Sequence, residues 1–353
     1  MLTYLAEMFN FENWANCLIL RGFLAFLTAF TVSLACGNKL IEFLRKHQKK
    51  GQPIREDGPK SHLLTKKGTP TMGGFLILGA SILSMLLFCN MANVFVWVGI
   101  GVLIIYGAVG FVDDYVKVTK QTSNAMTAKM KLLLQFATAL AAIWIISMQT
   151  PVEYRYYLSF PYVSWKLYLG WLYIPFAMIV IAGASNGVNL SDGLDGLAGG
   201  LLSIVFGVFM VGAYVAGGVL ALNSSVPVID GTQEVGVMCA AVIGGCLGFL
   251  WFNAKPASVF MGDTGSLALG AFLGVVAVIL KQEILLAIAG GVFVMESLSV
   301  MIQVGYFKLT KKRFFKMAPI HHHFEQAGWE ETKVVFRFWI IAVVLASIAF
   351  MAY

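Results

Sequence analysis

Long apolar runs, separated by short polar segments, dominate the pattern of the chain. A helix needs about 20 mostly apolar residues to cross a bilayer, and ten runs approach that length. They lie at residues 18–40, 71–89, 93–112, 132–149, 169–187, 197–219, 235–252, 265–280, 284–306 and 335–352. Because the runs are continuous, they do not match the alternating strands of a membrane β-barrel. The pattern predicts an all-α polytopic membrane protein, with residues 1–353 forming one transmembrane domain.

Composition and charge support this prediction and orient the chain. The 353 residues are 59% hydrophobic and only 12% charged, whereas soluble domains are about half apolar and a quarter charged. Nineteen of the 25 Lys and Arg residues fall in segments that alternating spans place on one face: 45–70, 113–131, 253–264 and 307–334. The positive-inside rule puts that face in the cytoplasm and both termini in the periplasm. The net charge of +7 therefore indicates topology, and we expect no nucleic-acid partner.

The loops on the opposite face offer little chemistry. Segment 150–168 is rich in Tyr and Trp, as an interfacial belt would be. Segment 220–234 contains Asp230 and Glu234, and we expect it to be a solvated connector. The five cysteines lie in or beside apolar runs without a CxxC pair, so we interpret them as packing residues.

The cytoplasmic segments carry the unusual polar residues. In "GFVDDYVK", Asp113 and Lys117 are four residues apart and share a helix face, while Asp114 points about 100° away. In "SNGVNLSDGLDGLAGG", amides and carboxylates recur every third residue among glycines, at Asn186, Asn189, Asp192 and Asp195. Polar groups at membrane depth are costly and usually line a functional cavity.

Two further segments complete the set. In "WFNAKPASVFMGDTGS", Asp263 lies among glycines that we expect to leave room for a diphosphate, and Asn253 precedes it. In "FKLTKKRFFKMAPIHHHFEQAGWEE", a basic aromatic stretch suits an anionic membrane surface. It leads to three consecutive histidines, which do not have the one-turn ligand spacing of a zinc motif.

Together these segments indicate phosphoryl transfer. Carboxylates alone repel an anion, but Mg²⁺ held by one or two carboxylates binds diphosphate oxygens and water. Lysines then neutralise the charge on the phosphoryl group, so the protein contributes mainly positioning and electrostatics. A site at the membrane boundary suits one lipid phosphate and one soluble nucleotide-linked substrate.

At this point the chain is seen to resemble a known family, the polyprenyl-phosphate N-acetylhexosamine-1-phosphate transferases. The stretches that carry the resemblance are "GTPTMGG" (68–74), "GFVDDYVK" (110–117), "NGVNLSDGLDGL" (186–197), "GFLWFNAKPASVFMGDTGS" (248–266), "ESLSVMIQVGYFKL" (296–309) and "MAPIHHHFEQAGW" (317–329). The DDxxK and NxxD-type motifs are typical of the whole superfamily, whereas "PIHHHFE" points to its muramoyl branch.

The resemblance implies a reaction and its partners. UDP-N-acetylmuramoyl-pentapeptide and undecaprenyl phosphate would give lipid I and UMP, the first membrane step of peptidoglycan synthesis. It also implies Mg²⁺, the bacterial inner membrane and a homodimer. Two alternatives remain: a sibling transferase that uses UDP-N-acetylglucosamine, and, more remotely, an ion-coupled transporter with polar residues near the bilayer midplane.

Roles follow as hypotheses. Asp263 would be the principal Mg²⁺ ligand, Asp113 would deprotonate or orient the lipid phosphate, and Asp114 would support the metal or Lys117. Phe260 would stack on uracil. The expected catalytic set is Asp113, Asp114, Lys117, Asp263, His321 and His322. The expected substrate-binding set is Lys67, Lys129, Lys131, Asn186, Asn189, Asp192, Asp195, Asn253, Phe260, Gln303 and His323.

Some assignments stay open on sequence alone. The resemblance does not decide whether Lys129 or Lys131 contacts phosphate, nor whether Asp263 attacks to form a covalent intermediate. Glu296 and Gln303 lie within an apolar run, where polar side chains are functional candidates. Glu296 is equally compatible with a helix-packing hydrogen bond and with a wall of the site, whereas Gln303 lies nearer the cytoplasmic end.

Overall fold

The computed structural model describes residues 17–48, 51, 66, 68–122, 125–220 and 226–353. Its helices are α3 Leu18–His47, α5 Gly74–Phe88, α6 Val94–Lys120, α7 Ala128–Gln149, α8 Tyr173–Ser191, α9 Leu197–Ala216, α10 Gln233–Asn253, α11 Gly262–Ile279, α12 Glu283–Ala289, α13 Gly291–Thr310, α14 Ile320–Gln326 and α15 Glu331–Phe350. A short 3₁₀ helix, Gly170–Leu172, precedes α8. A small hairpin of β1 Tyr157–Ser159 and β2 Lys166–Tyr168 pairs Tyr157 with Tyr168.

The predicted all-α membrane architecture is confirmed. Among the described residues, nine helices are long and apolar enough to cross a membrane. The apolar run at 71–89 forms α5, which has only 15 residues and is shorter than the other spans. The outer faces of the bundle expose large apolar side chains such as Trp144 on α7 and Ile340 on α15, as contact with lipid requires.

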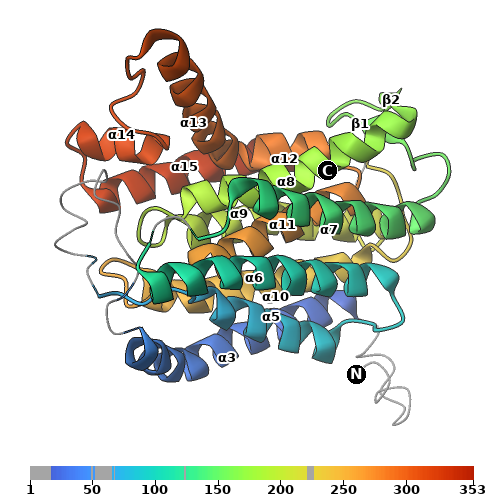
Figure 1. Ribbon diagram of the computed structural model, residues 1–353. Helices are drawn as coiled ribbons and strands as arrows, with labels where there is room; N and C mark the ends of the chain where they lie inside the picture. Colours follow the sequence, from blue (N-terminus) through green and yellow to red (C-terminus); the bar gives the residue numbers. More distant parts are fainter. Residues whose placement is uncertain (1–16, 49–50, 52–65, 67, 123–124, 221–225) are drawn as a thin grey trace.

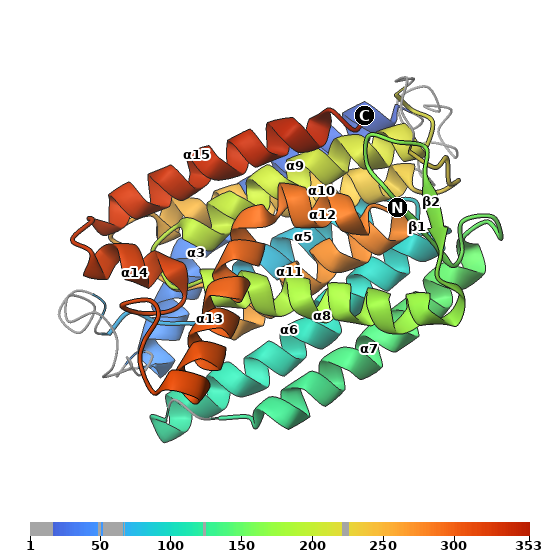
Figure 2. The same cartoon turned by 90° about the horizontal axis from the view of Figure 1, so that it is seen from above.

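The long helices lie side by side, and the chain turns back and forth between the two ends of the bundle (Figures 1 and 2). The C-terminus and the β1–β2 hairpin lie at one end. The other end carries α14 and the connections α6–α7, α8–α9 and α10–α11. The described parts of the segments that the sequence assigned to a single membrane face therefore meet at one end.

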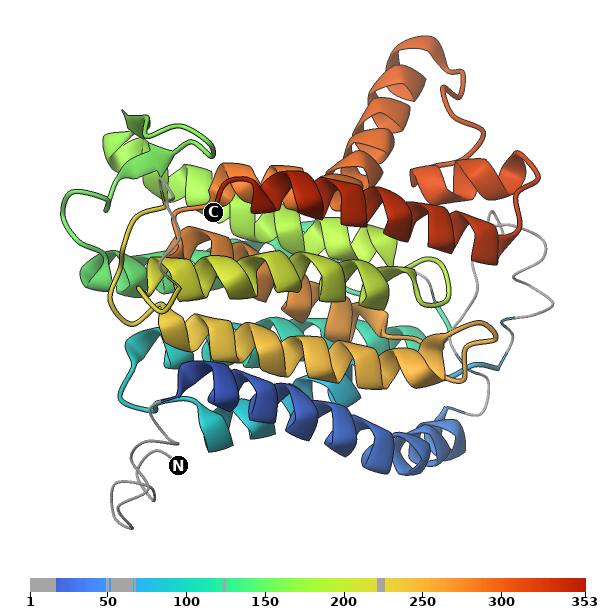
Figure 3. The same ribbon diagram turned by 180° about the vertical axis from the view of Figure 1, so that it is seen from behind.

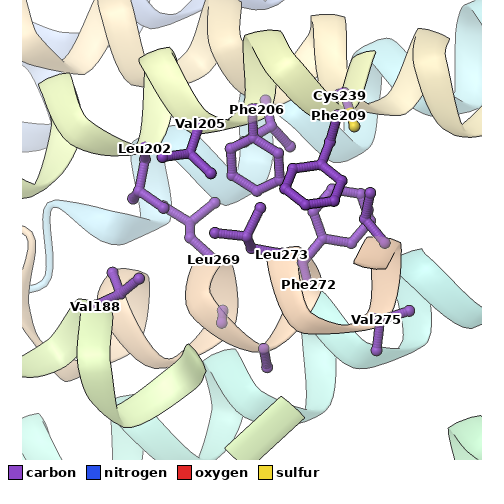
Figure 4. Close-up of a cluster of buried hydrophobic side chains, with 14 of the residues drawn as sticks. Val188, Leu202, Val205, Phe206, Phe209, Cys239, Leu269, Phe272, Leu273 and Val275 are labelled. Atoms are coloured by element: carbon purple, nitrogen blue, oxygen red, sulfur yellow. The ribbon is translucent and has the colours of Figure 1, made fainter. Parts of the chain in front are cut away.

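Helix α11 forms the centre of the bundle, and nearly all of its residues are buried. Figure 4 shows Phe206 and Phe209 of α9 packed against Leu269, Phe272 and Leu273 of α11. The Phe206 and Phe272 ring centroids are 5.6 Å apart. This dense apolar layer fixes the position of α11, whose first turn reaches the polar end of the bundle.

Helix α3 contacts α10 through small side chains. Its buried face repeats them every three or four positions, at Gly22, Ala25, Ala29, Ser33 and Gly37. A side chain added at Gly248 of α10 would collide with Ser33. Such close backbone approach supplies the van der Waals packing that holds helices together in lipid, where apolar burial gives no driving force.

The apolar run at 284–306, predicted as one span, is two helices. The chain breaks at Gly290, between α12 and α13, and α13 leans away from the bundle (Figures 1 and 3). Two consecutive glycines, Gly290 and Gly291, are poor helix formers and allow the change of direction. A hydropathy profile does not reveal this break, because the two glycines change neither the length of the run nor its apolar character.

The interpretation of segment 220–234 as a solvated connector is wrong for its C-terminal part, where Ile229, Thr232 and Glu234 are buried; residues 221–225 lie outside the described residues. Glu234 is buried in the first turn of α10 and forms an ion pair with Arg21 of α3. Its second carboxylate oxygen accepts a hydrogen bond from Asn90 N at 2.9 Å. Asp230 is exposed, as expected. Arg21 lies within an apolar run, and a buried cation there needs a carboxylate partner.

Candidate active site

Two aspartates and two lysines form the centre of the polar end. Lys117 Nζ lies 2.6 Å from Asp113 Oδ2 and 3.1 Å from Asp263 Oδ2. Lys131 Nζ lies 3.2 Å and 2.7 Å from the same two oxygens. The predicted pairing of Asp113 with Lys117 along one helix face is confirmed. Lys129, two residues earlier on α7, is exposed instead.

Asp114 points away from this centre and holds the start of α11. Its carboxylate accepts hydrogen bonds from Asp263 N at 3.2 Å, Thr264 N at 3.0 Å and Thr264 Oγ1 at 2.8 Å. Unpaired amides and the helix dipole make an N-terminus a favourable place for a carboxylate. Asp114 therefore fixes the backbone from which the Asp263 side chain projects.

A second carboxylate steadies the same turn. Asp192 Oδ2 accepts a hydrogen bond from Gly262 N at 3.2 Å. Burial, together with the nearby charges of Asp263 and Asp114, raises the pKa of Asp192 well above its usual range. Gly262 has φ +73°, and a side chain there would collide with Asp114 and Thr71. This glycine therefore serves close backbone packing, rather than the space for a diphosphate that the sequence led us to expect.

Carboxylates outnumber lysines in this cluster. Asp113 and Asp263 contact Lys117 and Lys131 directly, and Asp114 and Asp192 are bonded to the turn that carries Asp263. The Asp263 side chain is 13% exposed, against 3% for Asp113. No group of three or more His, Cys, Asp or Glu within the described residues encloses a metal position. Mg²⁺ commonly takes only one or two carboxylates and completes its shell with phosphate and water oxygens. The excess of acidic oxygens near Asp263 fits that mode of binding.

The two asparagines of α8 have different partners. Asn189 Nδ2 donates to Asp263 Oδ1 at 2.9 Å and to Ser266 Oγ at 2.8 Å, so it joins the centre. Asn186 Nδ2 donates to Gln135 Oε1 of α7 at 2.8 Å and to the carbonyl oxygen of Ala182 at 2.7 Å. Within this structure Asn186 links α8 to α7 rather than entering the cluster.

A second charged cluster lies at the same end of the bundle. Lys66 Nζ is 2.8 Å from Asp195 Oδ1 and 2.6 Å from Glu331 Oε1. Lys255 Nζ is 3.1 Å from Glu331 Oε2. Burial by itself lowers the pKa of Lys66, but the carboxylates of Glu331 and Asp195 outweigh it and raise that pKa. Lys66 therefore stays charged although little of it is exposed.

Phe260 and Asn253 lie beside this second cluster. The Lys66 ammonium is 5.8 Å from the centroid of the Phe260 ring. Asn253 Oδ1 accepts from Gly196 N at 2.9 Å, and its Nδ2 donates to the carbonyl oxygen of Val259 at 2.9 Å. Both ends of this amide hold neighbouring loops, and the nucleotide contact expected of Asn253 stays a prediction.

The three histidines of α14 turn to three different partners. His321 is fully buried with its Nδ1 3.1 Å from Glu296 Oε2, and its ring lies against Gly193. His322 Nδ1 lies 2.7 Å from Glu325 Oε2. His323 Nδ1 accepts a hydrogen bond from Lys316 N at 3.1 Å.

The contact with His321 bears on the open role of Glu296. The Glu296 carboxylate contacts His321, whose ring lies against Gly193 in the α8–α9 connection. This position favours a role for Glu296 in the wall of the site over a hydrogen bond that only packs helices. Gln303 lies farther along α13, where its Oε1 accepts from Phe315 N at 2.8 Å and anchors the basic aromatic segment. Lys67 lies outside the described residues.

Comparison with known proteins identifies the family. Residues 95–281 match the model of glycosyl transferase family 4. A phospho-N-acetylmuramoyl-pentapeptide-transferase of Ruegeria sp. (strain TM1040) is 49% identical over 349 residues, which is 98% of this chain and 97% of that protein. The chain belongs to the phospho-N-acetylmuramoyl-pentapeptide transferases.

The family-4 match covers only part of the polar end of this transferase. Its range contains Asp113, Asp263 and the α8–α9 connection, and it ends before α12. Helices α13 to α15, with the histidines and Glu331, are covered by the similarity to the full-length transferase. The central cluster thus lies within the range of the family-4 match, and the region after residue 281 lies within the range of the similarity to the full-length transferase.

Sequence reasoning missed two charged residues of this transferase site. We favoured Lys67 over Lys66 in "KKGTP", although Lys66 is the one found beside Asp195. Glu331 ends the string "GWEE" and drew no attention. The available signal was a carboxylate at the boundary between a polar segment and an apolar run, the same signal that marked Asp113.

Proposed function

We propose that the protein transfers phospho-N-acetylmuramoyl-pentapeptide from its UDP-linked donor to undecaprenyl phosphate, giving lipid I and UMP. The observation that carries this proposal is the central cluster, where Asp113 and Asp263 share Lys117 and Lys131 at one end of a membrane-spanning bundle. Such a site is reached by a lipid phosphate from the membrane and by a nucleotide substrate from water. The similarity to a transferase of that name supports the choice of substrate.

In this proposal Asp113 accepts a proton from the lipid phosphate, or orients that phosphate for attack on the donor diphosphate. Lys117 and Lys131 already lie within hydrogen-bonding distance of the reacting carboxylates. They can turn toward phosphate oxygens and neutralise charge during phosphoryl transfer. Asp114 acts indirectly, because it fixes the turn that carries Asp263.

We propose Mg²⁺ as the cofactor, held by Asp263. The ion would supply positive charge to the donor diphosphate and to the leaving UMP. Asn189, bonded to Asp263 Oδ1, keeps that carboxylate oriented toward the cluster. The surplus of carboxylates over lysines is the feature of the chain that favours a divalent cation here.

The nucleotide half of the donor is assigned to the second cluster. Asp192 and Asp195 lie in the connection from α8 to α9, Asn189 precedes them in the last turn of α8, and Phe260 offers a ring for uracil to stack on. The histidines of α14 are assigned to the diphosphate or sugar. His321 is held by Glu296 and Gly193, and therefore acts from a fixed position.

We further propose that the polar end faces the cytoplasm of a bacterium, in its inner membrane, that both termini face the periplasm, and that the protein is a homodimer. The positive charge of the segments at that end supports the orientation. The acidic cluster lies in the first turn of α11 and at the C-terminal end of α8, at one end of the bundle. This position favours an enzyme over a transporter, whose ion site would lie near the midplane.

The test is UMP release by the purified protein in detergent with undecaprenyl phosphate and Mg²⁺. Parallel reactions contain UDP-N-acetylmuramoyl-pentapeptide or UDP-N-acetylglucosamine. We expect UMP only from the muramoyl donor, and we expect EDTA to abolish it. UMP from the acetylglucosamine donor alone would place the protein in the sibling branch, and undiminished release in EDTA would reject the metal.

A further inference from the structure

Glu331, the first residue of α15, contacts three other segments that are far from it in the sequence. Its Oε1 lies 2.6 Å from Lys66 Nζ and accepts a hydrogen bond from Asp195 N at 3.0 Å. Its Oε2 lies 3.1 Å from Lys255 Nζ. One carboxylate therefore contacts the segment before α5, the α8–α9 turn and the α10–α11 loop.

Burial makes these contacts energetically important. Glu331 is 6% exposed and Lys66 is 8% exposed. When one partner of a buried ion pair is removed, the other is left as an uncompensated buried charge. Without the Glu331 carboxylate, Asp195 would be the remaining anion beside Lys66, and the Asp195 amide would lose its acceptor. The Lys66 ammonium would then be held beside the Phe260 ring by one carboxylate instead of two.

A second residue of α15 braces the same turn. Trp339 lies against Gly200, and its indole Nε1 donates to the carbonyl oxygen of Leu197 at 3.4 Å. Glu331 and Trp339, which both lie on α15, therefore contact the beginning and the end of segment 195–200. The position of the nucleotide cluster therefore depends on α15, which contributes no residue to the central carboxylate–lysine cluster.

We infer that Glu331 is a positioning residue for the UDP half of the donor substrate, acting through Lys66 and the amide of Asp195. This inference rests on the proposed function, because it takes the second cluster as the nucleotide site. It assigns Glu331 to donor affinity and specificity rather than to the phosphoryl-transfer step. The carboxylate holds the cation in place while the nucleotide binds beside it.

The test compares Glu331→Gln with Glu330→Gln. The glutamine at 331 keeps the size of the side chain and can still accept the Asp195 hydrogen bond, but it loses the charge that fixes Lys66 and Lys255. Glu330 is exposed, so its variant makes the same change one residue away. Four quantities are measured in detergent: KM for the UDP donor, KM for undecaprenyl phosphate, kcat, and the Kd for UMP by calorimetry.

For Glu331→Gln we expect the donor KM and the UMP Kd to rise about tenfold, as the loss of one charge-assisted contact implies. We expect kcat and the KM for the lipid to be unchanged, and Glu330→Gln to match the wild type. Unchanged UMP affinity in Glu331→Gln would overturn the inference. An equal loss in kcat and both KM values, with a lower melting temperature, would show a merely structural role and would also overturn it.

A double-mutant cycle identifies the route of the effect. In a Lys66→Met background, Glu331→Gln should have a much smaller effect on the UMP Kd, because the cation that it positions is gone. An undiminished effect would mean that Glu331 does not act through Lys66. If wild-type protein released no UMP from either donor, the proposed function would fail, whereas the UMP titrations would still decide the role of Glu331.

Discussion

The two ends of the bundle both bury charged residues, but they pair them differently. At the end that carries the candidate site, each of two lysines contacts both Asp113 and Asp263. At the opposite end, Arg21 pairs with Glu234, and Lys281 lies 3.8 Å from Glu283 and 3.5 Å from the centre of the Tyr173 ring. At the first end, two lysines share the same two carboxylates and further carboxylates lie nearby. At the opposite end, each cation is matched with one carboxylate.

This difference separates charges that are available to a substrate from charges that hold helices together. A lysine with two carboxylate partners can leave one for a phosphate oxygen and remain neutralised by the other. An isolated buried pair has no such alternative, because breaking it leaves an uncompensated charge. We therefore expect substitutions at the candidate site to reduce turnover, and substitutions at the opposite end to reduce stability.

The largest effect is expected from Asp263→Asn. Loss of the charge that would hold Mg²⁺ should lower kcat at least about a thousandfold in the UMP-release assay. The protein should remain folded, because Lys117 and Lys131 each keep Asp113 as a carboxylate partner. Asp230→Asn makes the same change at an exposed position of the opposite end and should keep wild-type turnover. Wild-type rates in Asp263→Asn would refute its assignment.

A smaller loss of turnover is expected from Lys131→Met. Its ammonium contacts both central carboxylates, but Lys117 contacts them too and can compensate in part. We expect kcat to fall about a hundredfold. The matched control is Lys129→Met, two residues earlier on α7 and exposed, which should be silent. The reverse result would assign the phosphate contact to Lys129.

At the opposite end of the bundle, Arg21→Met should destabilise the protein without lowering its kcat. Glu234 would remain buried without its cation, at a cost of roughly 3 kcal/mol. The apparent Tm in detergent should therefore fall by several degrees, while kcat of the folded fraction stays at the wild-type value. A large loss of kcat with unchanged Tm would contradict the distinction between the two ends.

The smallest effect concerns Lys281. Burial lowers the pKa of its ammonium to about 8, with Glu283 opposing that shift. Above that pH the folded protein releases the proton while the unfolded chain, with its ordinary lysine pKa, keeps it. Stability should therefore increase by roughly 1 kcal/mol between pH 7 and 9. Lys281→Met should remove this increase in melting experiments across that range, and an unaltered pH dependence in the variant would assign it to other groups.

Hydropathy predicted the architecture because lipid imposes a simple rule of length and apolar character on each span. Asp113 and Lys117 could be paired from their spacing alone, since contacts four residues apart are local to a helix. Alternation of spans also placed the polar segments at one end. These successes share a property: each follows from neighbours in the sequence or from the membrane itself.

The residues whose roles could not be predicted from the sequence make contacts between distant segments of the chain. Glu331 and Lys66 are 265 residues apart, and no local pattern links them. Glu234 looked like a loop residue because its partner, Arg21, lies 213 positions away on another helix. The role of Gly262 in fitting the backbone between Asp114 and Thr71 likewise needs three segments in place. Only the folded bundle distinguishes these residues from solvated ones.

The most direct test of the distinction between the two ends measures Asp113→Asn and Glu234→Gln side by side. Each variant removes one buried carboxylate charge that faces a cation, and both kcat for UMP release and apparent Tm are measured in the same detergent. We expect Asp113→Asn to lower kcat while its Tm stays close to the wild-type value, and Glu234→Gln to lower Tm while its kcat stays close to the wild-type value. If both variants lowered kcat and Tm together, the two clusters would not differ in function and the distinction between the two ends would be refuted.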